Sequence, residues 1–429
     1  MRRQRDIIPT LFIFSGRLQV QPAPVMDTIT HALAGALIGK AFFAEDPPAA
    51  GISWRQLPRS GDRAAIACSA LGAIFPDIDV VAVLFTNDNL AFIARHRGVT
   101  HSLLMLPVWA AGLTLLAGFL ARRARWPAPA FAALFSVFGA ALASHIFLDL
   151  LTPWGTMAWS PYDHSRLAWD SLFIIDLTVT LIVLLPQLSA WVHGRAERSI
   201  WLAPAVWILL SAAAFALAPW VRSLDVPLST EAAAGACVVF AVFLLVPLRH
   251  RGRSRFGRVI WCRLGVALLA GYLSFAAGMH YVALGRVRQF AREGNFDYQR
   301  LAALPLPPSP ARWAGLIATG EGVYRVQFNL LGGENLRIDF FRNAAANRYL
   351  SGARDLPGVQ TFLWFARFPV FGYLEREGRP VVQISDVRFV GPRRPGISAT
   401  LPTPVANFSY EVVFTPDGRV VSSGPLQVN

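Results

Sequence analysis

The chain has 429 residues, of which 54% are hydrophobic and only 15% are charged, and its mean hydropathy is +0.43. A soluble domain carries about 25% charged residues, so this composition excludes an ordinary soluble protein and is typical of an integral membrane protein. The formal net charge of +14 does not indicate a nucleic-acid partner, because arginine-rich loops on the cytoplasmic face of a membrane explain it more simply.

The first 25 residues differ from those that follow. Arg2, Arg3 and Arg5 precede an apolar stretch (7–14) that is too short to span a bilayer and lacks the features of a signal peptide. Met26 then opens MDTITHALAGALIG, which has the form of a second start. We interpret residues 1–25 as a non-native N-terminal extension or a start-site error, which favours Met26 over Met1 as the natural start of translation.

Long apolar segments predict an all-α polytopic membrane helix bundle of about eight spans, followed by a C-terminal β-rich soluble domain. Runs of about 20 apolar residues match the thickness of a bilayer core. The first segment is short and contains Lys40, and its Gly35 and Gly39 would allow a neighbouring helix to approach closely. The predicted spans are 28–44, 64–86, 100–121, 129–151, 171–192, 200–221, 232–248 and 259–284.

The composition changes after the last span. A proline-rich stretch, LPLPPSP, is followed by short alternating runs such as VYRVQF, LRIDFF, VVQISDVRFV and YEVVF, and TPDG at 415–418 predicts a hairpin turn. We therefore divide the chain after residue 25 into a first membrane domain (26–192), additional transmembrane helices (193–285), a linker (286–310) and the β-rich domain (311–429). The three cysteines lie within apolar runs and form no CxxC pair, so neither a disulfide framework nor a thiolate zinc site is expected.

Arginine is distributed unevenly between the gaps that separate the spans. Arginine-rich gaps occur at 45–63, 122–127, 193–199 and 249–258. The gaps on the opposite side hold only Arg95, Arg97, Arg166 and Arg222. Because arginine-rich loops remain in the cytoplasm, this asymmetry predicts that the arginine-poor side and the C-terminal domain are non-cytoplasmic.

Side chains that can bind metal ions are placed at the ends of the predicted spans. They are His31 at the start of the first, Asp77 and Asp79 (FPDID) late in the second, His96 and His101 (RHRGVTHS) at the start of the third, and His145 and Asp149 (HIFLD) at the end of the fourth. Successive spans of an up-and-down bundle alternate in direction, so all these ends fall on the arginine-poor face. The spacing of four between His145 and Asp149 places both on one helix face.

A shared metal site explains why charged residues that are unfavourable within a membrane are present. One Asp near the centre of a bilayer costs about 2.5–3.5 kcal/mol, and a metal site can supply about 10 kcal/mol or more. Histidine nitrogens with carboxylate oxygens favour zinc, with manganese or magnesium as alternatives, and more than four candidate ligands suggest more than one ion. We expect the metal ligands to be His31, Asp77, His96, His101, His145 and Asp149.

Other polar residues near this face have two interpretations each. Asp79, Arg97 and Asp170 are candidate catalytic residues. Asp79 could equally orient a ligand, and Arg97 could bind a substrate phosphate or pair with a carboxylate. Asp176 and His164 could simply form structural hydrogen bonds.

The motifs as a set resemble the YdjM-type family of LexA-regulated, bacterial inner-membrane metal-dependent hydrolases. The resemblance rests on MDTITHALAGA (26–36), FPDIDV (75–80), HRGVTHS (96–102), HIFLDLLTPWG (145–155) and WDSLFIID (169–176), and it covers about residues 26–190. It implies a multi-pass protein of the bacterial inner membrane with a divalent metal cofactor.

This family is distantly similar to zinc-dependent phospholipase C and P1-type nucleases. Those enzymes bind three zinc ions through the N-terminal residue, a histidine five residues later and HxxxD helices. Here His31 follows Met26 by five residues, and His145 with Asp149 supplies one HxxxD motif. A second HxxxD motif is missing and residues 1–25 would block a free amino group at Met26, which puts a three-metal site in doubt.

The sequence therefore predicts a membrane-bound metal-dependent hydrolase that acts on a phosphoester or lipid-like substrate through metal-activated water. The bilayer is its one expected partner, and protein partners are not indicated. The alternative is a non-enzymatic membrane protein, either a metal transporter or a scaffold, in which the His/Asp cluster is structural. A transporter would need polar groups continued across the membrane, and the last three predicted spans show almost none.

Overall fold

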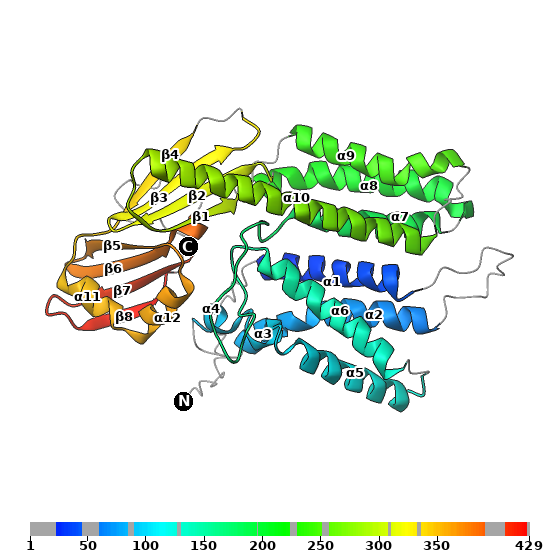
Figure 1. The fold of residues 1–429 in the computed structure, drawn as a ribbon, viewed down its shortest axis with the longest axis horizontal. Helices are drawn as coiled ribbons and strands as arrows, with labels where there is room; N and C mark the ends of the chain where they lie inside the picture. The colour runs from blue at the N-terminus through cyan, green and yellow to red at the C-terminus, as the bar shows by residue number, and fades with distance from the viewer. Residues whose placement is uncertain are drawn as a thin grey trace, which may run out of the picture.

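The protein consists of a helical part and two β-sheets that lie at one end of the helices (Figure 1). The structure is a computed structural model that describes residues 23–44, 60–84, 90–126, 130–194, 196–223, 230–250, 257–307, 310–332, 336–390 and 408–426. Most of the predicted extension (1–25) and most of the arginine-rich gaps 45–63 and 249–258 lie outside these residues.

The first group of helices carries all the candidate metal ligands. It comprises α1 (Ala23–Phe42), α2 (Ser60–Ile74), the 3-10 turn η1 (Phe75–Asp77), α3 (Ile78–Leu84), α4 (Ala91–Arg95), the 3-10 turn η2 (Val99–His101), α5 (Leu106–Arg123) and α6 (Phe131–Leu150). Pro76 has no backbone N–H to donate, and the chain changes from α-helix to a 3-10 turn at this point. Helices α3 and α4 lie at the end of the bundle nearest the sheets (Figure 1).

The second group comprises α7 (Leu177–His193), α8 (Ala196–Ser223), α9 (Thr230–Leu244), the 3-10 turn η3 (Val246–His250) and α10 (Arg258–Glu293). Asp176 caps α7 by accepting hydrogen bonds from the backbone N–H groups of Thr178 and Val179. Its other carboxylate oxygen accepts a hydrogen bond from the Tyr272 hydroxyl of α10 at 2.8 Å. Asp176 therefore forms structural hydrogen bonds, which agrees with one of the two interpretations of this residue.

Every predicted span contains a helix, but eight spans are not confirmed. Among the described residues, five helices are long and apolar enough to cross a membrane: Arg63–Val81, Phe131–Leu150, Ser199–Pro219, Thr230–Leu248 and Arg258–Glu293. A sixth span results if the pair Ala91–His101 and Leu106–Arg123, bent by 76°, is counted as one. Helix α7 is apolar but has only 17 residues, and α1 is not among the helices that qualify.

Small residues let α1 and α2 pack with their backbones close together. A Cβ atom added to Gly35 would lie 2.5 Å from the Cβ atom of Ala73, and one added to Gly39 would lie 2.9 Å from the Cβ atom of Ser69. The Ser69 hydroxyl also donates a hydrogen bond to the Gly35 carbonyl at 2.7 Å. This close approach brings the start of α1 beside the end of α2, where Asp77 follows.

The C-terminal part contains two four-stranded antiparallel sheets, each with its strands in sequential order. The first holds β1 (Tyr298–Pro305), β2 (Arg312–Thr319), β3 (Gly322–Asn329) and β4 (Arg337–Arg342); the second holds β5 (Pro369–Arg376), β6 (Arg379–Asp386), β7 (Ser409–Phe414) and β8 (Val420–Pro425). Helices α11 (Arg348–Arg354) and α12 (Pro357–Phe365) connect the sheets, and the 3-10 turn η4 (Val387–Phe389) follows β6. The TPDG segment forms the predicted turn, in which the Gly418 N–H donates to the Thr415 carbonyl.

The segment predicted as a linker (286–310) is instead part of the folded structure. Helix α10 continues to Glu293, and strand β1 begins at Tyr298. Ala283, Val287 and Ala291 of α10 form one buried cluster with Trp313 and Ile317 of β2. Pro305 is the last residue of the first strand, and the apolar face of α10 covers the sheet.

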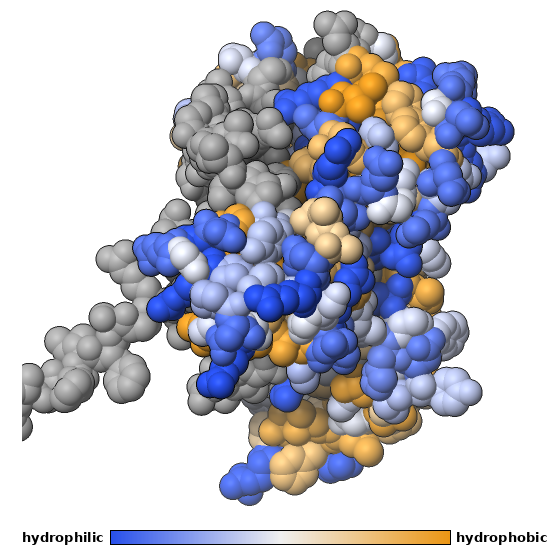
Figure 2. Space-filling view, turned by 90° about the vertical axis from the view of Figure 1, so that its left-hand side faces the viewer, coloured by the Kyte–Doolittle hydropathy of each residue, from blue (hydrophilic) through white to orange (hydrophobic). Residues whose placement is uncertain are grey.

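The two parts share a hydrophobic core. Ile93 and Trp154, from the helical part, belong to the buried cluster that contains Phe365, Phe371 and Ile384 of the C-terminal part. The surface at the sheet end is largely hydrophilic, as expected for a region outside a bilayer (Figure 2). The C-terminal domain is thus fixed to the end of the helical bundle that carries the candidate metal ligands.

Candidate metal centre

The predicted ligands converge at the sheet end of the helical bundle. They come from α1 (His31), η1 (Asp77), the segment from α4 to η2 (His96 and His101) and α6 (His145 and Asp149), and the candidate catalytic residues Asp79 and Arg97 lie beside them. Two groups have potential ligand atoms that all lie within 4.8 Å of one another: His31, His145 and Asp149 form one, and Asp77, His96 and His101 form the other. The groups meet where His101 and His145 face each other.

Four of these atoms, from His101, His145, Asp77 and Asp149, lie close together in the pairs given below. The Nε2 atoms of His101 and His145 are 3.1 Å apart. The Asp77 Oδ1 atom lies 3.5 and 3.6 Å from these two nitrogens, and the Asp149 Oδ2 atom lies 3.3 and 3.4 Å from them. A regular tetrahedron with edges of about 3.4 Å has its centre about 2.1 Å from each corner, which matches zinc bond lengths to nitrogen and oxygen. The five distances are therefore compatible with a divalent metal ion shared by these atoms.

Hydrogen bonds at the far side of each ring direct the Nε2 lone pairs of His101 and His145 into the cluster. The Nδ1 atom of His145 lies 2.6 Å from the Ala73 carbonyl, which can only accept, so Nδ1 carries the proton. The Nδ1 atom of His101 lies 3.2 Å from Asp79 Oδ2. Both Nε2 atoms then face each other and two carboxylate oxygens, an arrangement that suits a shared cation.

The second oxygen of Asp149 faces different partners. Asp149 Oδ1 lies 2.7 Å from Arg97 Nη2 and 3.3 Å from His31 Nε2. The His31 ring also stacks on the His145 ring, with centroids 3.8 Å apart. Asp149 therefore joins the four-atom set to His31 and to the guanidinium group of Arg97.

Arg97 connects two carboxylates that approach it from opposite sides. Its backbone has a φ of 60°, in the left-handed region that non-glycine residues rarely adopt. In this conformation its N–H donates to Asp79 Oδ2 at 3.0 Å, while its buried guanidinium reaches Asp149 and donates to the Thr152 hydroxyl at 2.7 Å. Arg97 was expected either to bind a substrate phosphate or to pair with a carboxylate. The structure shows the ion pair with the Asp149 carboxylate.

Asp79 lies behind the ring nitrogens rather than among the four central atoms. Its Oδ1 contacts His96 Nδ1 at 2.9 Å, and its Oδ2 accepts from the Arg97 N–H and from the Thr100 hydroxyl, each at 3.0 Å, beside His101 Nδ1. A carboxylate with this many donors is held in place and orients the rings. The geometry favours this orienting role over the catalytic role that the sequence suggested.

Asp170 does not contact the cluster residues. Its two oxygens accept hydrogen bonds at 2.7 and 2.8 Å from the two terminal nitrogens of Arg367, which lies in the C-terminal domain. Burial lowers the pKa of Arg367, but the hydrogen bonds and negative charge of Asp170 outweigh burial and raise it above its usual value. Asp170 thus holds the two domains together, and a catalytic role for it stays a prediction.

Several residues of the centre were not found from the sequence. Thr28 donates to Asp77 Oδ2 at 2.7 Å, and Arg166 donates to the backbone carbonyls of Ile93 and His96 at 2.8 and 2.7 Å. Burial, together with nearby arginines, lowers the pKa of Arg166 to about 9. The one available signal was that Arg166 lies in a gap that is otherwise poor in arginine. Threonine in an apolar helix gives no comparable signal.

Comparisons with known proteins agree with the position of this centre. Residues 26–221, which contain every candidate ligand, match the YdjM inner membrane protein family. The uncharacterized protein YfhP of Bacillus subtilis (strain 168) is 28% identical over 171 residues, which are 39% of this chain and 47% of YfhP, so the match spans about half of that relative. No solved structure matches the chain. The distant similarity to phospholipase C and P1-type nucleases stays a prediction.

Proposed function

We propose that this chain, whose residues 26–221 belong to the YdjM inner membrane protein family, is a membrane-bound metal-dependent hydrolase that acts on a phosphoester. The observation that carries the proposal is the convergence of four donor atoms, from His101, His145, Asp77 and Asp149. Two nitrogen and two oxygen donors favour zinc. A divalent cation held here would polarise a phosphoryl oxygen and activate water.

The surrounding residues supply orientation and positive charge. Asp79 fixes the rings of His96 and His101, so that the Nε2 atom of His101 stays directed at the centre. Arg97 places a buried positive charge 2.7 Å from Asp149, next to the donor atoms. Such a fixed charge stabilises an anionic phosphoester and the charge that develops during its hydrolysis.

The geometry supports one ion best, although the sequence suggested more than one. A second ion would use His31 and the Oδ1 atom of Asp149, and Arg97 already holds that oxygen. The guanidinium group of Arg97 is thus placed where a second metal ion would otherwise supply positive charge. We propose a single zinc ion with Arg97 as the second cation.

A structural metal site is the second candidate, and one observation favours it. Four protein donors fill a tetrahedral shell completely, as in structural zinc sites, whereas catalytic zinc keeps one position for water or substrate. Asp77 is the most exposed of the four donors, with 14% of its side chain accessible, and it is the donor that could yield its position to substrate. Hydrolysis requires that Asp77 leaves its position on the metal to substrate or water.

Metal analysis followed by a substrate screen tests the proposal. Protein purified in detergent should contain about one zinc per chain and should hydrolyse at least one phosphoester from a panel of soluble and lipid substrates. Chelation should abolish the activity, and zinc should restore it. Stoichiometric zinc in a chain that hydrolyses no member of the panel would favour the structural role instead.

The proposed orientation follows from the arginine distribution. The centre and the C-terminal domain lie at the same end of the helical bundle, so they share one side of the membrane (Figure 1). The arginine-rich gaps would be cytoplasmic, which puts the centre and the domain on the non-cytoplasmic side of a bacterial inner membrane.

A further inference from the structure

We propose that the C-terminal domain seals the metal centre from the aqueous side, so that the substrate is a membrane lipid that enters from the bilayer beside α1 and α3. The inference rests on the hydrolase function proposed above and names the substrate class of the same site. Three features support it: an aromatic layer over the centre, a set of arginine contacts that fixes that layer, and an apolar surface at the least buried ligand.

Aromatic rings cover the centre on the side of the C-terminal domain. The His96 ring stacks on Phe92, with centroids 4.8 Å apart, and Trp154 lies next to both rings. Trp154 in turn contacts Phe365 and Phe408 of the C-terminal domain, with centroids 4.8 and 5.0 Å away. A continuous layer of rings therefore separates His96 from water on this side.

Buried arginines fix this layer to the helical part. Arg166 donates to the Ile93 and His96 carbonyls, and its guanidinium lies over the rings of Trp364 and Phe365. The bidentate pair of Asp170 with Arg367 adds a contact between the domains. Because these groups are largely buried, separating the domains would expose apolar rings and leave charged groups without their partners.

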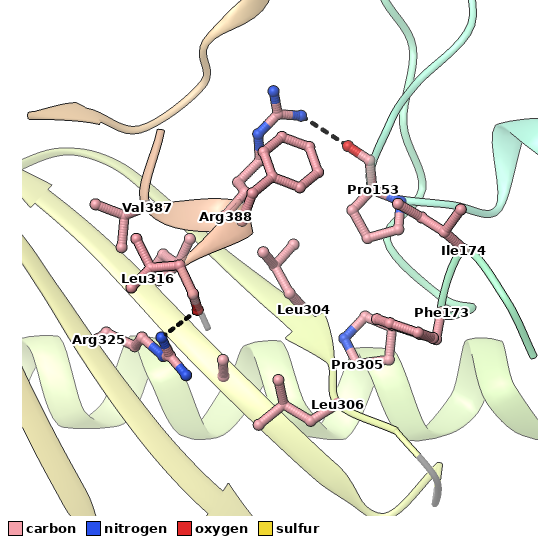
Figure 3. A pocket seen from close by; sticks show the side chains of 13 residues that line it. Pro153, Phe173, Ile174, Leu304, Pro305, Leu306, Leu316, Arg325, Val387 and Arg388 are labelled. Carbon is pink, nitrogen blue, oxygen red and sulfur yellow. Dashed lines mark hydrogen bonds between the residues drawn. The ribbon is translucent and has the colours of Figure 1, made fainter. Parts of the chain in front are cut away.

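The boundary between the domains is also closed beside Pro153. Arg388 donates to the Pro153 carbonyl at 2.7 Å and to the Asp386 carboxylate at 2.8 Å (Figure 3). The cavity at this boundary has a volume of about 70 Å³ and is lined mainly by apolar residues such as Phe173 and Leu304.

The centre is least buried at Asp77 and Asp79. Asp77 and Asp79 have 14% and 11% of their side chains accessible, compared with 3% or less for His31, His101, His145, Asp149 and Arg97. Ile78 lies between these two aspartates and is 53% exposed. Ile29, next to the Thr28 that binds Asp77, is also 53% exposed, and Val81 is 50% exposed.

Exposed isoleucine and valine beside a carboxylate favour an amphipathic ligand. In a helix bundle that spans a membrane, such side chains face lipid chains. A phospholipid or another lipid with a phosphorylated head group could keep its chains against Ile29 and Ile78 while its phosphate reaches Asp77 and Arg97. A soluble phosphoester would gain nothing from the apolar surface and would have to pass the sealed side.

Metal extraction tests the seal without relying on catalysis. Zinc-loaded protein in lipid nanodiscs, in which both faces meet water, is treated with hydrophilic EDTA or with membrane-permeant 1,10-phenanthroline. Arg367→Met removes the contact with Asp170 and should raise the rate of zinc loss to EDTA at least tenfold, without changing the rate with phenanthroline. Asp170→Asn weakens the same contact from the other partner and should raise the rate of zinc loss to EDTA in the same way.

The matched control is Arg376→Met. Arg376 forms an equally bidentate pair with Glu411, at 3.1 and 2.9 Å, on the second sheet, where it does not touch the helical part. The Arg376→Met variant should lose zinc to EDTA at the same rate as the wild type. Thermal unfolding first confirms that all variants are folded. If the wild type, Arg367→Met and Asp170→Asn then lose zinc to EDTA at equal rates, the proposed seal is overturned.

Substrate preference tests the route. The wild type in nanodiscs should hydrolyse phosphatidic acid and leave soluble p-nitrophenyl phosphate intact, whereas Arg367→Met should gain at least tenfold on the soluble ester. Equal rates on both esters in the wild type would overturn entrance from the bilayer. If neither is hydrolysed, the hydrolase function fails, and with it the lipid substrate, while the EDTA rates still decide the seal.

Discussion

The Nε2 atoms of His101 and His145 lie 3.1 Å apart, and each ring binds its other nitrogen to an acceptor that lies outside this pair. Two neutral imidazoles held in this way cannot hydrogen-bond to each other, because both present a lone pair. Two carboxylate oxygens face the same point. The pair thus suits a cation between the rings, and it is the structural basis of the predictions below.

The ligand assignment predicts a loss of bound metal in cluster variants. His145→Ala and Asp149→Ala should each weaken zinc binding at least about 100-fold, because each removes one of the central donor atoms, a larger loss than the 10- to 100-fold that orienting residues cause. His280→Ala is the control, since His280 lies on α10 beside Trp313, away from the centre. Zinc content is measured on purified protein. Wild-type content in both cluster variants would remove the assignment.

Asp79 and Asp77 should differ in the size of their effects. Asp79→Asn keeps the size of the side chain but weakens the contacts with His96 and His101, so zinc affinity should fall about 10- to 100-fold. Asp77→Asn replaces a central donor and should lower affinity further. Competition with a fluorescent zinc chelator measures both. A larger loss for Asp79→Asn than for Asp77→Asn would contradict the orienting role.

Arg97 should stabilise the metal-free protein in particular. Arg97→Met leaves the buried Asp149 carboxylate without its closest positive charge, which typically costs about 3–5 kcal/mol. Zinc should recover much of this loss, because the ion supplies another positive charge to the same carboxylate. Thermal unfolding with and without zinc measures the effect, with the exposed Arg95→Met as control. An equal loss in the zinc-loaded protein would argue against a zinc ion next to Asp149.

The orientation of the protein can be tested with protease. Because the centre and the C-terminal domain share one end of the bundle, external protease should cleave within 290–429 in intact spheroplasts. A tag placed in the arginine-rich gap 249–258 should be cleaved only after lysis. The reverse pattern would place the centre in the cytoplasm.

The sequence was sufficient to predict that the ligands lie close together. His145 and Asp149 share a helix face by their spacing, and alternating spans place the other ligands at the same end. It assigned Asp77 as a ligand and Asp79 as a catalytic residue, but it did not establish the orienting role of Asp79, because this role depends on the 3-10 turn at Pro76 and on contacts with Arg97 and Thr100. Side-chain direction across such a break has no signature in the sequence.

Other features depend on contacts between distant parts of the chain. Asp170 looked catalytic because it is an aspartate near the cluster, and its partner Arg367 lies 197 residues further on. Eight spans are not confirmed because, among the described residues, α1 and α7 are helices that do not meet the length and hydropathy requirement for a span. Their burial against other helices, rather than hydropathy alone, determines their position.

Helix α10 has a mechanical consequence for the whole molecule. Its 36 residues extend without interruption from the bundle to the first sheet. At 1.5 Å per residue it measures about 54 Å, well beyond the bilayer core of about 30 Å. It therefore acts as a rigid strut that sets the height of the sheets above the lipid surface. Adding one turn would raise the first sheet by about 5.4 Å and rotate it little, which is enough to pull Arg367 away from Asp170.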